Sequence, residues 1–273
     1  MPSLSQVTDI ERIDRDLYRG EPMDSQLIRT YGGQIACQTL TAAVRTVEAD
    51  RSVHSLHGYF LRAGDPKKST VFSVDRVRDG RSFSTRRVSA LQEGEVIFSM
   101  SASFQVGGQE GFEHQDQMPE VVGPEDLTNI RDLDLSGQPR AFFDEWTEWD
   151  IRFIPADQQK LYPVLAAQQR VWFRYTGELS DDPNDHVCAL AYMSDMTLLG
   201  SARVPHPGVE IQEASLDHAM WFQRPFRADE WLLYDQTSPS ATLGRSLTQG
   251  RIFDSHGNLV AAVTQEGLTR TGG

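Results

Sequence analysis

One aspartate in this sequence stands in an apolar, helix-like segment, where an acid is unexpected. Residues 186–199 read HVCALAYMSDMTLL, and apolar side chains recur there at helical spacing along one stripe. Asp195 follows Ala191 by four residues and Val187 by eight, so it lies on or beside that stripe. A carboxylate facing a core is costly unless it is paired or hydrogen-bonded, whereas in an active site it can act as a general base. The spacing equally allows a shifted register in which Asp195 is solvated or paired with an arginine.

A weak internal repeat surrounds this residue. The first half contains, in order, Ser55-Leu56, Phe60-Leu61-Arg62, Gly80-Arg81-Ser82 and Phe104-Gln105; the second contains Ser215-Leu216, Phe222-Gln223-Arg224, Gly244-Arg245-Ser246 and Thr264-Gln265. Matches in register of this kind indicate an internal duplication. Aligning Tyr31 with His186 places Leu40 opposite Asp195, so one copy has a leucine where the other has an acid. A duplicated enzyme with one working site would show that asymmetry.

Each copy of the repeat predicts one helix and several strands. A helix should follow Gly32-Gly33, and residues 96–104 alternate with the period of a strand. Further strands are predicted at Thr70–Arg78, Ser82–Leu91, Ala214–Phe222, Glu230–Gln236, Leu243–Phe253 and Leu259–Gly267, with a hairpin turn at Asp79-Gly80. The pattern predicts an α+β architecture of two similar halves. We place an N-terminal unit at residues 1–106, a linker with one or two short helices at 107–162, and a C-terminal unit at 163–273.

Composition and charge exclude several classes of protein. The chain has 273 residues, a net charge of −13 and a pI near 4.9, which argues against nucleic acid or anionic membranes as partners. It has no run of 18 apolar residues, and its first residues lack the apolar core of a signal peptide, so we expect no membrane span. Cys37 and Cys188 stand outside any CxxC pair, which predicts reduced, buried thiols in a cytoplasmic protein.

Several longer strings resemble the acyl-CoA thioesterase II family, whose members fold as two fused hotdog units. The strings are Tyr31-Gly32-Gly33-Gln34, His54–Asp65, Asp79–Arg87, Ser101–Gln105, Phe112–Pro119, Tyr192–Asp195, Leu216–Trp231 and Val263–Gly267. They follow the family's order, and the similarity covers nearly the whole chain. The resemblance implies a double hotdog of the α+β class, an acyl-CoA substrate and hydrolysis to free fatty acid and CoA, without a cofactor.

The resemblance also implies three catalytic residues. In that family a carboxylate, a hydroxyl and a glutamine amide surround the attacking water, and these fall on Asp195 in YMSD, Ser215 in ASLDH and Gln265 in TQEG. Asp195 would act as general base or, through an anhydride, as nucleophile; the other two would hold the water or the base. Two residues depart from the family pattern: Ser215 replaces a threonine, which keeps the hydroxyl, and Gln223 replaces a histidine, which can alter substrate contacts. The first half then serves as a structural partner that helps form the acyl pocket.

Two further groups of residues could contact a ligand. His54 and His57 form an HxxH pair, but on a strand they should face opposite sides of the sheet, so we expect no metal site; His54 stays a minor candidate for a catalytic or substrate contact. A basic cluster could receive the phosphates of CoA or could form a solvated strand face with alternating ion pairs. Its members are Arg76, Arg78, Arg81, Arg86 and Arg87, with Lys67-Lys68 nearby.

Two other functions stay open on the sequence alone. A hotdog hydratase acting on enoyl-thioesters would pair the acid with a histidine, so His186 or His218 beside Asp195 would favour it. A second alternative is a catalytically silent acyl-CoA-binding protein, which tight binding without turnover or an Asp195 locked by an arginine would support. Because hotdog sheets commonly continue from one subunit to the next, we expect a homo-oligomer by analogy with the fold.

Overall fold

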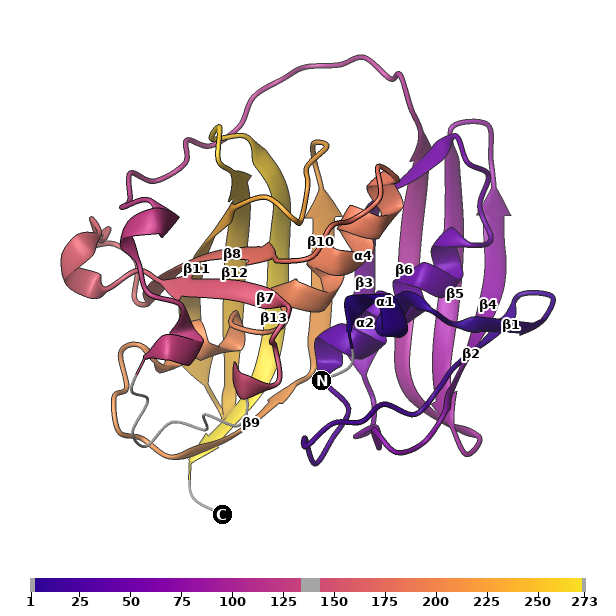
Figure 1. The fold of residues 1–273 in the computed structure, drawn as a ribbon, viewed down its shortest axis with the longest axis horizontal. Helices are drawn as coiled ribbons and strands as arrows, with labels where there is room; N and C mark the ends of the chain where they lie inside the picture. The colour runs from indigo at the N-terminus through magenta and orange to yellow at the C-terminus, as the bar shows by residue number, and fades with distance from the viewer. Residues whose placement is uncertain (1–2, 134–142, 272–273) are drawn as a thin grey trace. The chain divides into compact units, whose positions relative to one another are not determined.

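The computed structural model describes residues 3–133 and 143–271, and the chain forms two compact units (Figure 1). The first unit comprises the chain up to His114 together with Ser180–Asp195 and Asp217–Phe222. The second comprises Gln115–Leu179, Met196–Leu216 and the chain from Gln223 onward. Each unit contains one antiparallel sheet. Within the described residues, no helix is long and apolar enough to cross a membrane.

The sheet of the first unit has the strand order β1-β2-β4-β5-β6-β3-β10. Its strands are β1 (Glu11–Asp14), β2 (Leu17–Gly20), β3 (Arg51–Phe60), β4 (Thr70–Asp79), β5 (Phe83–Gln92), β6 (Glu95–Val106) and β10 (Asp217–Phe222). The helices of this unit are α1 (Leu4–Thr8), α2 (Gly32–Val44) and α4 (Pro183–Ser194). The predicted alternation in β6 is confirmed: Phe98, Met100, Ala102 and Phe104 are buried, and the serines between them are not.

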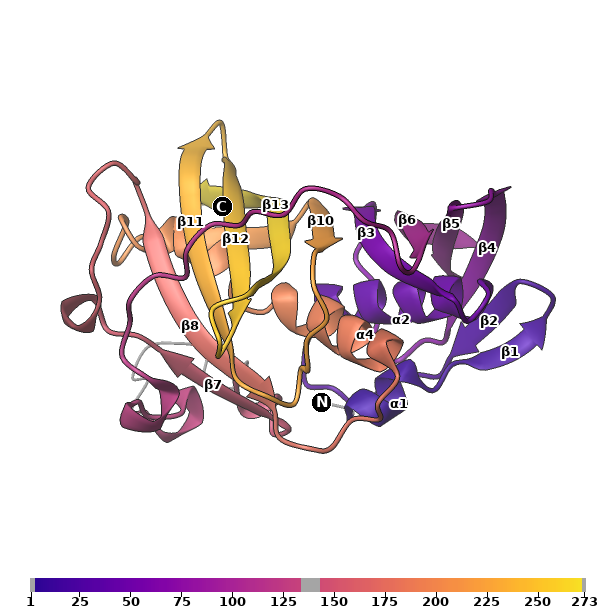
Figure 2. The same ribbon diagram turned by 90° about the horizontal axis from the view of Figure 1, so that it is seen from above.

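Helix α2 covers the buried face of this sheet, and α4 packs beside α2 (Figure 2). Two glycines at the start of α2 permit that approach. A Cβ on Gly33 would lie 2.1 Å from the Tyr192 carbonyl oxygen, to which Tyr31 Oη donates a hydrogen bond of 2.7 Å. The predicted buried thiols are confirmed, since Cys37 and Cys188 are free and buried in α2 and α4. Burial raises the pKa of the Cys188 thiol to about 12.

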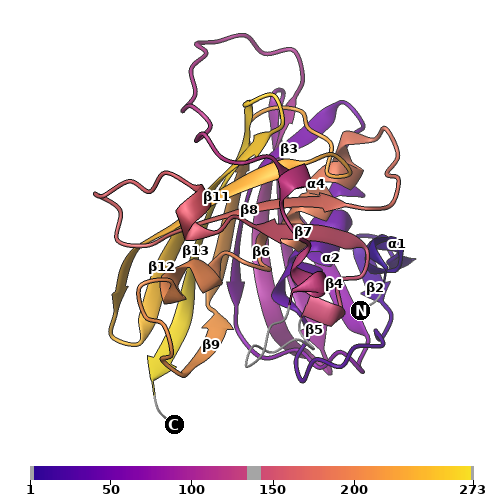
Figure 3. The same ribbon diagram turned by 60° about the vertical axis from the view of Figure 1, so that its left-hand side comes forward.

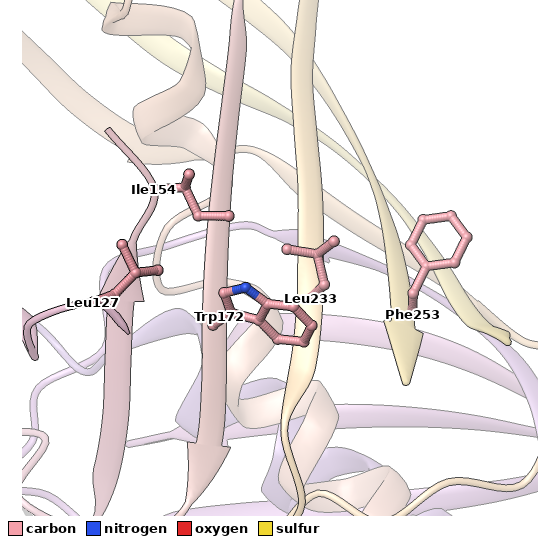
Figure 4. Packing of buried hydrophobic residues seen from close by; sticks show 5 residues of the cluster. All are labelled: Leu127, Ile154, Trp172, Leu233 and Phe253. Atoms are coloured by element: carbon pink, nitrogen blue, oxygen red, sulfur yellow. The ribbon is translucent and has the colours of Figure 1, made fainter. Parts of the chain in front are cut away.

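The sheet of the second unit has the strand order β9-β13-β12-β11-β8-β7 (Figure 3). Its strands are β7 (Trp149–Phe153), β8 (Gln168–Tyr175), β9 (Ile211–Ser215), β11 (Leu232–Thr242), β12 (Arg245–Asp254) and β13 (Leu259–Thr271). The 3-10 helix η4 (Leu199–Arg203) packs against β11, β12 and β13. One hydrophobic cluster of this unit contains Leu127, Ile154, Trp172, Leu233 and Phe253 (Figure 4).

The strand predictions differ from the structure in three places. The segment predicted at Ala214–Phe222 is two strands, because β9 pairs with β13 and β10 pairs with β3. Strand β11 runs on to Thr242, and the chain turns at Leu243-Gly244, where both residues have positive φ (51° and 70°). The sequence pattern does not predict the hairpin β1–β2 or strands β7 and β8; β7 lies in the expected linker.

The described part of the remaining linker is largely irregular. The 3-10 helices there are η1 (Pro124–Asp126), η2 (Ile130–Asp132) and η3 (Ala156–Gln158). Strand β7 is short, and its buried residues Trp149, Asp150 and Ile151 are consecutive, so it lacks the period-two signal of a strand. The division of the chain at residues 106 and 162 stays a prediction.

Candidate active site

Asp195 lies at the C-terminal end of α4. The helix begins at Asp182, whose side chain accepts a hydrogen bond of 2.9 Å from the Asn184 N–H, and Pro183 fills the first helical position. It ends at Ser194, with Asp195 as the C-cap (φ −82°, ψ −14°). The prediction of a helix reaching residue 199 was therefore wrong. Asp195 follows the apolar stripe instead of interrupting it, and its side chain is half-buried.

The carboxylate of Asp195 lies against the first residue of α2. A Cβ on Gly32 would be 2.5 Å from Asp195 Oδ2, so a larger residue at this position would displace the carboxylate. The first-turn N–H groups of an α-helix have no intrahelical acceptors, and they form the positive end of the helix dipole. Gly32-Gly33 is the sequence signal for this contact, although on the sequence alone it indicates only the start of a helix.

His218 lies close to Asp195 within the same unit, next to Ser194. The Ser194 hydroxyl donates to the Ala191 carbonyl oxygen (3.1 Å), and His218 Nε2 lies 2.8 Å from the same hydroxyl oxygen. His218 is 1% exposed. Burial lowers its pKa, while the nearby charges of Asp195 and Asp217 act in the opposite direction. The net direction favours a neutral imidazole.

Ser215 and Gln265 are hydrogen-bonded to each other in the second unit. Ser215 ends β9 and pairs with Gly267 of β13, so Gln265 lies two residues away on the neighbouring strand. Gln265 Nε2 donates to Ser215 Oγ at 2.7 Å. Gln265 is fully buried, and its backbone carbonyl accepts a hydrogen bond of 2.9 Å from Thr248 Oγ1. The serine hydroxyl accepts this bond and retains a hydrogen to donate.

Within the second unit, the structure brings the predicted catalytic residues Ser215 and Gln265 together. Ser215 and Gln265 form a direct contact, while Asp195 belongs to the other compact unit. In the first copy, the position that corresponds to Asp195 is Leu40, a fully buried residue of α2.

The basic cluster of the first half forms ion pairs. This agrees with the interpretation of a strand face with alternating ion pairs. Arg76 pairs with Asp16 (2.8 Å) and Arg87 with Asp75 (3.0 Å). Arg86 is buried and reaches Asp79 at 2.7 Å. These guanidinium groups lower the pKa of Asp16 and of Asp79, chiefly through hydrogen bonds. Much of the charge of the cluster is therefore neutralised within the hairpin β4–β5 and its neighbours.

The prediction that His54 and His57 face opposite sides of the sheet was wrong. Strand β3 has a bulge between Val53 and Ser55, which shifts the alternation by one residue. His54 Nε2 lies 2.9 Å from Ser103 Oγ of β6, and His57 pairs with Ser101 of the same strand β6. Since Ser101 and Ser103 are two residues apart on β6, both histidine rings lie on one face of the sheet. Within residues 3–133 and 143–271, no group of three or more His, Cys, Asp or Glu could hold a metal ion.

Two family models match the chain. Residues 143–268 match a model described as acyl-CoA thioesterase, and residues 20–105 match one described as the acyl-CoA thioesterase N-terminal domain. Acyl-CoA thioesterase 2 of Haemophilus influenzae is 36% identical over 98% of this chain and 97% of its own length.

Solved structures show the same architecture. The acyl-CoA thioesterase II TesB2 of Mycobacterium marinum is 54% identical, with a TM-score of 0.89 over 99% of both chains. A protein with a hot dog fold from Alicyclobacillus acidocaldarius has a TM-score of 0.80 at 18% identity, covering 100% of both chains. The predicted α+β double hotdog is confirmed.

Proposed function

The chain belongs to the acyl-CoA thioesterase II family, and we propose that it hydrolyses fatty acyl-CoA with Asp195, Ser215 and Gln265 as its catalytic residues. Asp195 takes a proton from water, and the water oxygen attacks the thioester carbonyl carbon. The tetrahedral oxyanion then collapses, the carbon–sulfur bond breaks, and the CoA thiolate leaves and takes up the proton. The products are a free fatty acid and CoA.

The surroundings of Asp195 support its role as the base. Its carboxylate is half-buried and lies against Gly32, at the positive end of the α2 dipole. The first turn of α2 also offers backbone N–H groups that could stabilise the oxyanion. Ser194, the residue before Asp195, is held by His218. That contact fixes the end of α4, from which the acid projects.

The Ser215–Gln265 hydrogen bond is the observation that carries the assignment of the other two residues. Gln265 is fully buried and donates to Ser215 Oγ, so the serine hydroxyl hydrogen is directed toward a different acceptor. A hydroxyl oriented in this way can hold a water or a carboxylate in a fixed position. The proximity that it provides contributes to catalysis without any further chemistry.

The burial of His218 argues for thioester hydrolysis over enoyl hydration. A hydratase would need its histidine to exchange protons with the substrate. His218 is 1% exposed, and its Nε2 is engaged with Ser194. Its proximity to Asp195 is therefore consistent with a positioning role. The homo-oligomer and the cytoplasmic location stay predictions, as does the role of the first half in forming the acyl pocket.

Thiol release from acyl-CoAs of several chain lengths tests the proposal. Asp195→Asn keeps the size of the side chain and removes the base, so kcat should fall by about 10²- to 10⁴-fold while substrate still binds. Asp185→Asn is the matched control, because Asp185 is an exposed aspartate in the first turn of the same helix. It should keep full activity. Wild-type activity in Asp195→Asn would refute the assignment of the base, and a wild type that binds acyl-CoA without releasing thiol would identify a binding protein.

A further inference from the structure

The second unit contains a basic cavity that the proposed chemistry does not use. Its volume is about 610 Å³, and its lining includes residues of η4, of the turn between β11 and β12, and of the end of β13. The basic residues in its lining are Arg203, His206, Arg245 and Arg270. Arg203 and Arg245 form ion pairs with Glu213 and Glu266, so Arg270 supplies the unbalanced positive charge of this cavity, in a chain with a net charge of −13.

We propose that this cavity binds the phosphate groups at the nucleotide end of CoA. The inference rests on the proposed function, because an enzyme that hydrolyses acyl-CoA must accommodate a diphosphate and a 3′-phosphate some distance from the reacting bond. Guanidinium groups suit these ligands, since their planar N–H donors can bind two phosphate oxygens at once.

Arg270 is the central residue of this site. Among the described residues, no carboxylate forms an ion pair with its guanidinium group. Its side chain packs over the turn between β11 and β12, where a Cβ on Gly244 would lie 3.1 Å from Arg270 Cγ. Gly244 has a φ of 70°, so the turn that supports Arg270 itself requires glycine. Arg270 is thus a positioned cation whose charge is available to a ligand.

The other two arginines are held by exposed acids. Arg203 Nη1 lies 3.5 Å from Glu213, and Arg245 Nε lies 3.0 Å from Glu266. All four side chains are substantially exposed, and ion pairs of that kind contribute little to stability. Each guanidinium group keeps further N–H donors for a phosphate.

The distance along β13 fits the length of the substrate. Gln265 and Arg270 stand on this strand five residues apart, which corresponds to about 17 Å of strand. In CoA, about thirteen single bonds separate the sulfur from the first phosphorus, equivalent to a little over four extended residues or roughly 15 Å. Because side chains alternate along a strand, Gln265 and Arg270 project to opposite faces of β13, so this match concerns length along the strand only.

Adenosine 3′,5′-bisphosphate is the probe that isolates this end of CoA from the reaction. We expect it to bind the wild type in calorimetry and to bind Arg270→Ala at least about tenfold more weakly. Arg81→Ala tests the rival basic cluster of the first unit, because Arg81 stands in the exposed turn between β4 and β5 and the repeat aligns it with Arg245. It should bind like the wild type.

Kinetics with a truncated substrate then links the cavity to catalysis. Arg270→Ala should raise KM for acyl-CoA about tenfold and leave KM for acyl-pantetheine, which lacks the nucleotide, unchanged. An equal rise with both substrates, no rise with either, or a rise in Arg81→Ala instead would overturn the proposal. If the wild type hydrolyses neither substrate but binds the bisphosphate through Arg270, the anion site stands and the hydrolase assignment fails.

Discussion

The Ser215 hydroxyl accepts the hydrogen bond of Gln265 and is also a proposed catalytic group. Ser215→Ala would leave a fully buried amide donor without its acceptor and would remove the group that we expect to hold the water. We predict a fall in kcat of roughly tenfold to hundredfold, equivalent to about 1.4 to 2.8 kcal/mol of transition-state stabilisation. Ser215→Thr keeps the hydroxyl and should retain most of the activity. Steady-state thiol release distinguishes the variants, and full activity in Ser215→Ala would show that the hydroxyl has no catalytic role.

The three catalytic candidates follow from motif positions, and the sequence alone could not pair them physically. Ser215 and Gln265 are fifty residues apart, and their hydrogen bond exists only because β9 pairs with β13 in one register. Asp195 stands out in the sequence as an acid in an apolar stripe, although the helix ends one residue before it. The periodicity therefore singled out Asp195 for a reason that the structure does not share.

At the scale of elements, the pair of helices α2 and α4 depends on Gly33. A methyl group there would lie 2.1 Å from the Tyr192 carbonyl oxygen and 2.6 Å from the Tyr31 ring, so the helices would have to separate. We predict that Gly33→Ala lowers the free energy of unfolding by about 1 to 3 kcal/mol, as measured by urea denaturation. Gly200→Ala is the control, because Gly200 lies in η4 and a Cβ added there would have no neighbouring atom within 4 Å. Equal stability of the two variants would contradict the packing argument.

The elements that could be predicted are those with a clear period. The strict alternation at residues 96–104 predicted β6 because one face of that strand is buried and the other is not. Strand β7 offers no such signal, since its first three residues are all buried, and the break at Leu216 has no glycine or proline to mark it. The bulge in β3 has no sequence signal either, and it moves His54 to the face of His57.

Across the whole molecule, proton binding predicts loss of stability in two ranges of pH. His218 is buried with its pKa below the ordinary 6.5, so unfolding takes up a proton and stability falls as pH drops below 6.5. Three aspartates have pKa values below the ordinary 3.8: Asp16, Asp79 and Asp229. Their contribution to the free energy of unfolding is complete above pH 3.8 and is lost as the pH falls below that value. Urea unfolding at pH 7.5, 5.5 and 3 should show both losses. His218→Gln should remove much of the loss of stability between pH 7.5 and 5.5. A wild type equally stable at these two pH values would contradict the assignment of that loss to His218.

The chain passes from the first compact unit to the second directly after Asp195, and it returns to the first unit at Asp217. The first unit consequently takes a helix and a strand from the second half of the chain. A truncation anywhere between residues 115 and 179 would divide that unit instead of releasing it. The sequence pattern is that of a tandem duplication, yet the first compact unit includes α4 and β10 from the second half of the chain. A library that recombines the two halves as exchangeable modules would therefore have to transfer α4 and β10 together with the N-terminal half.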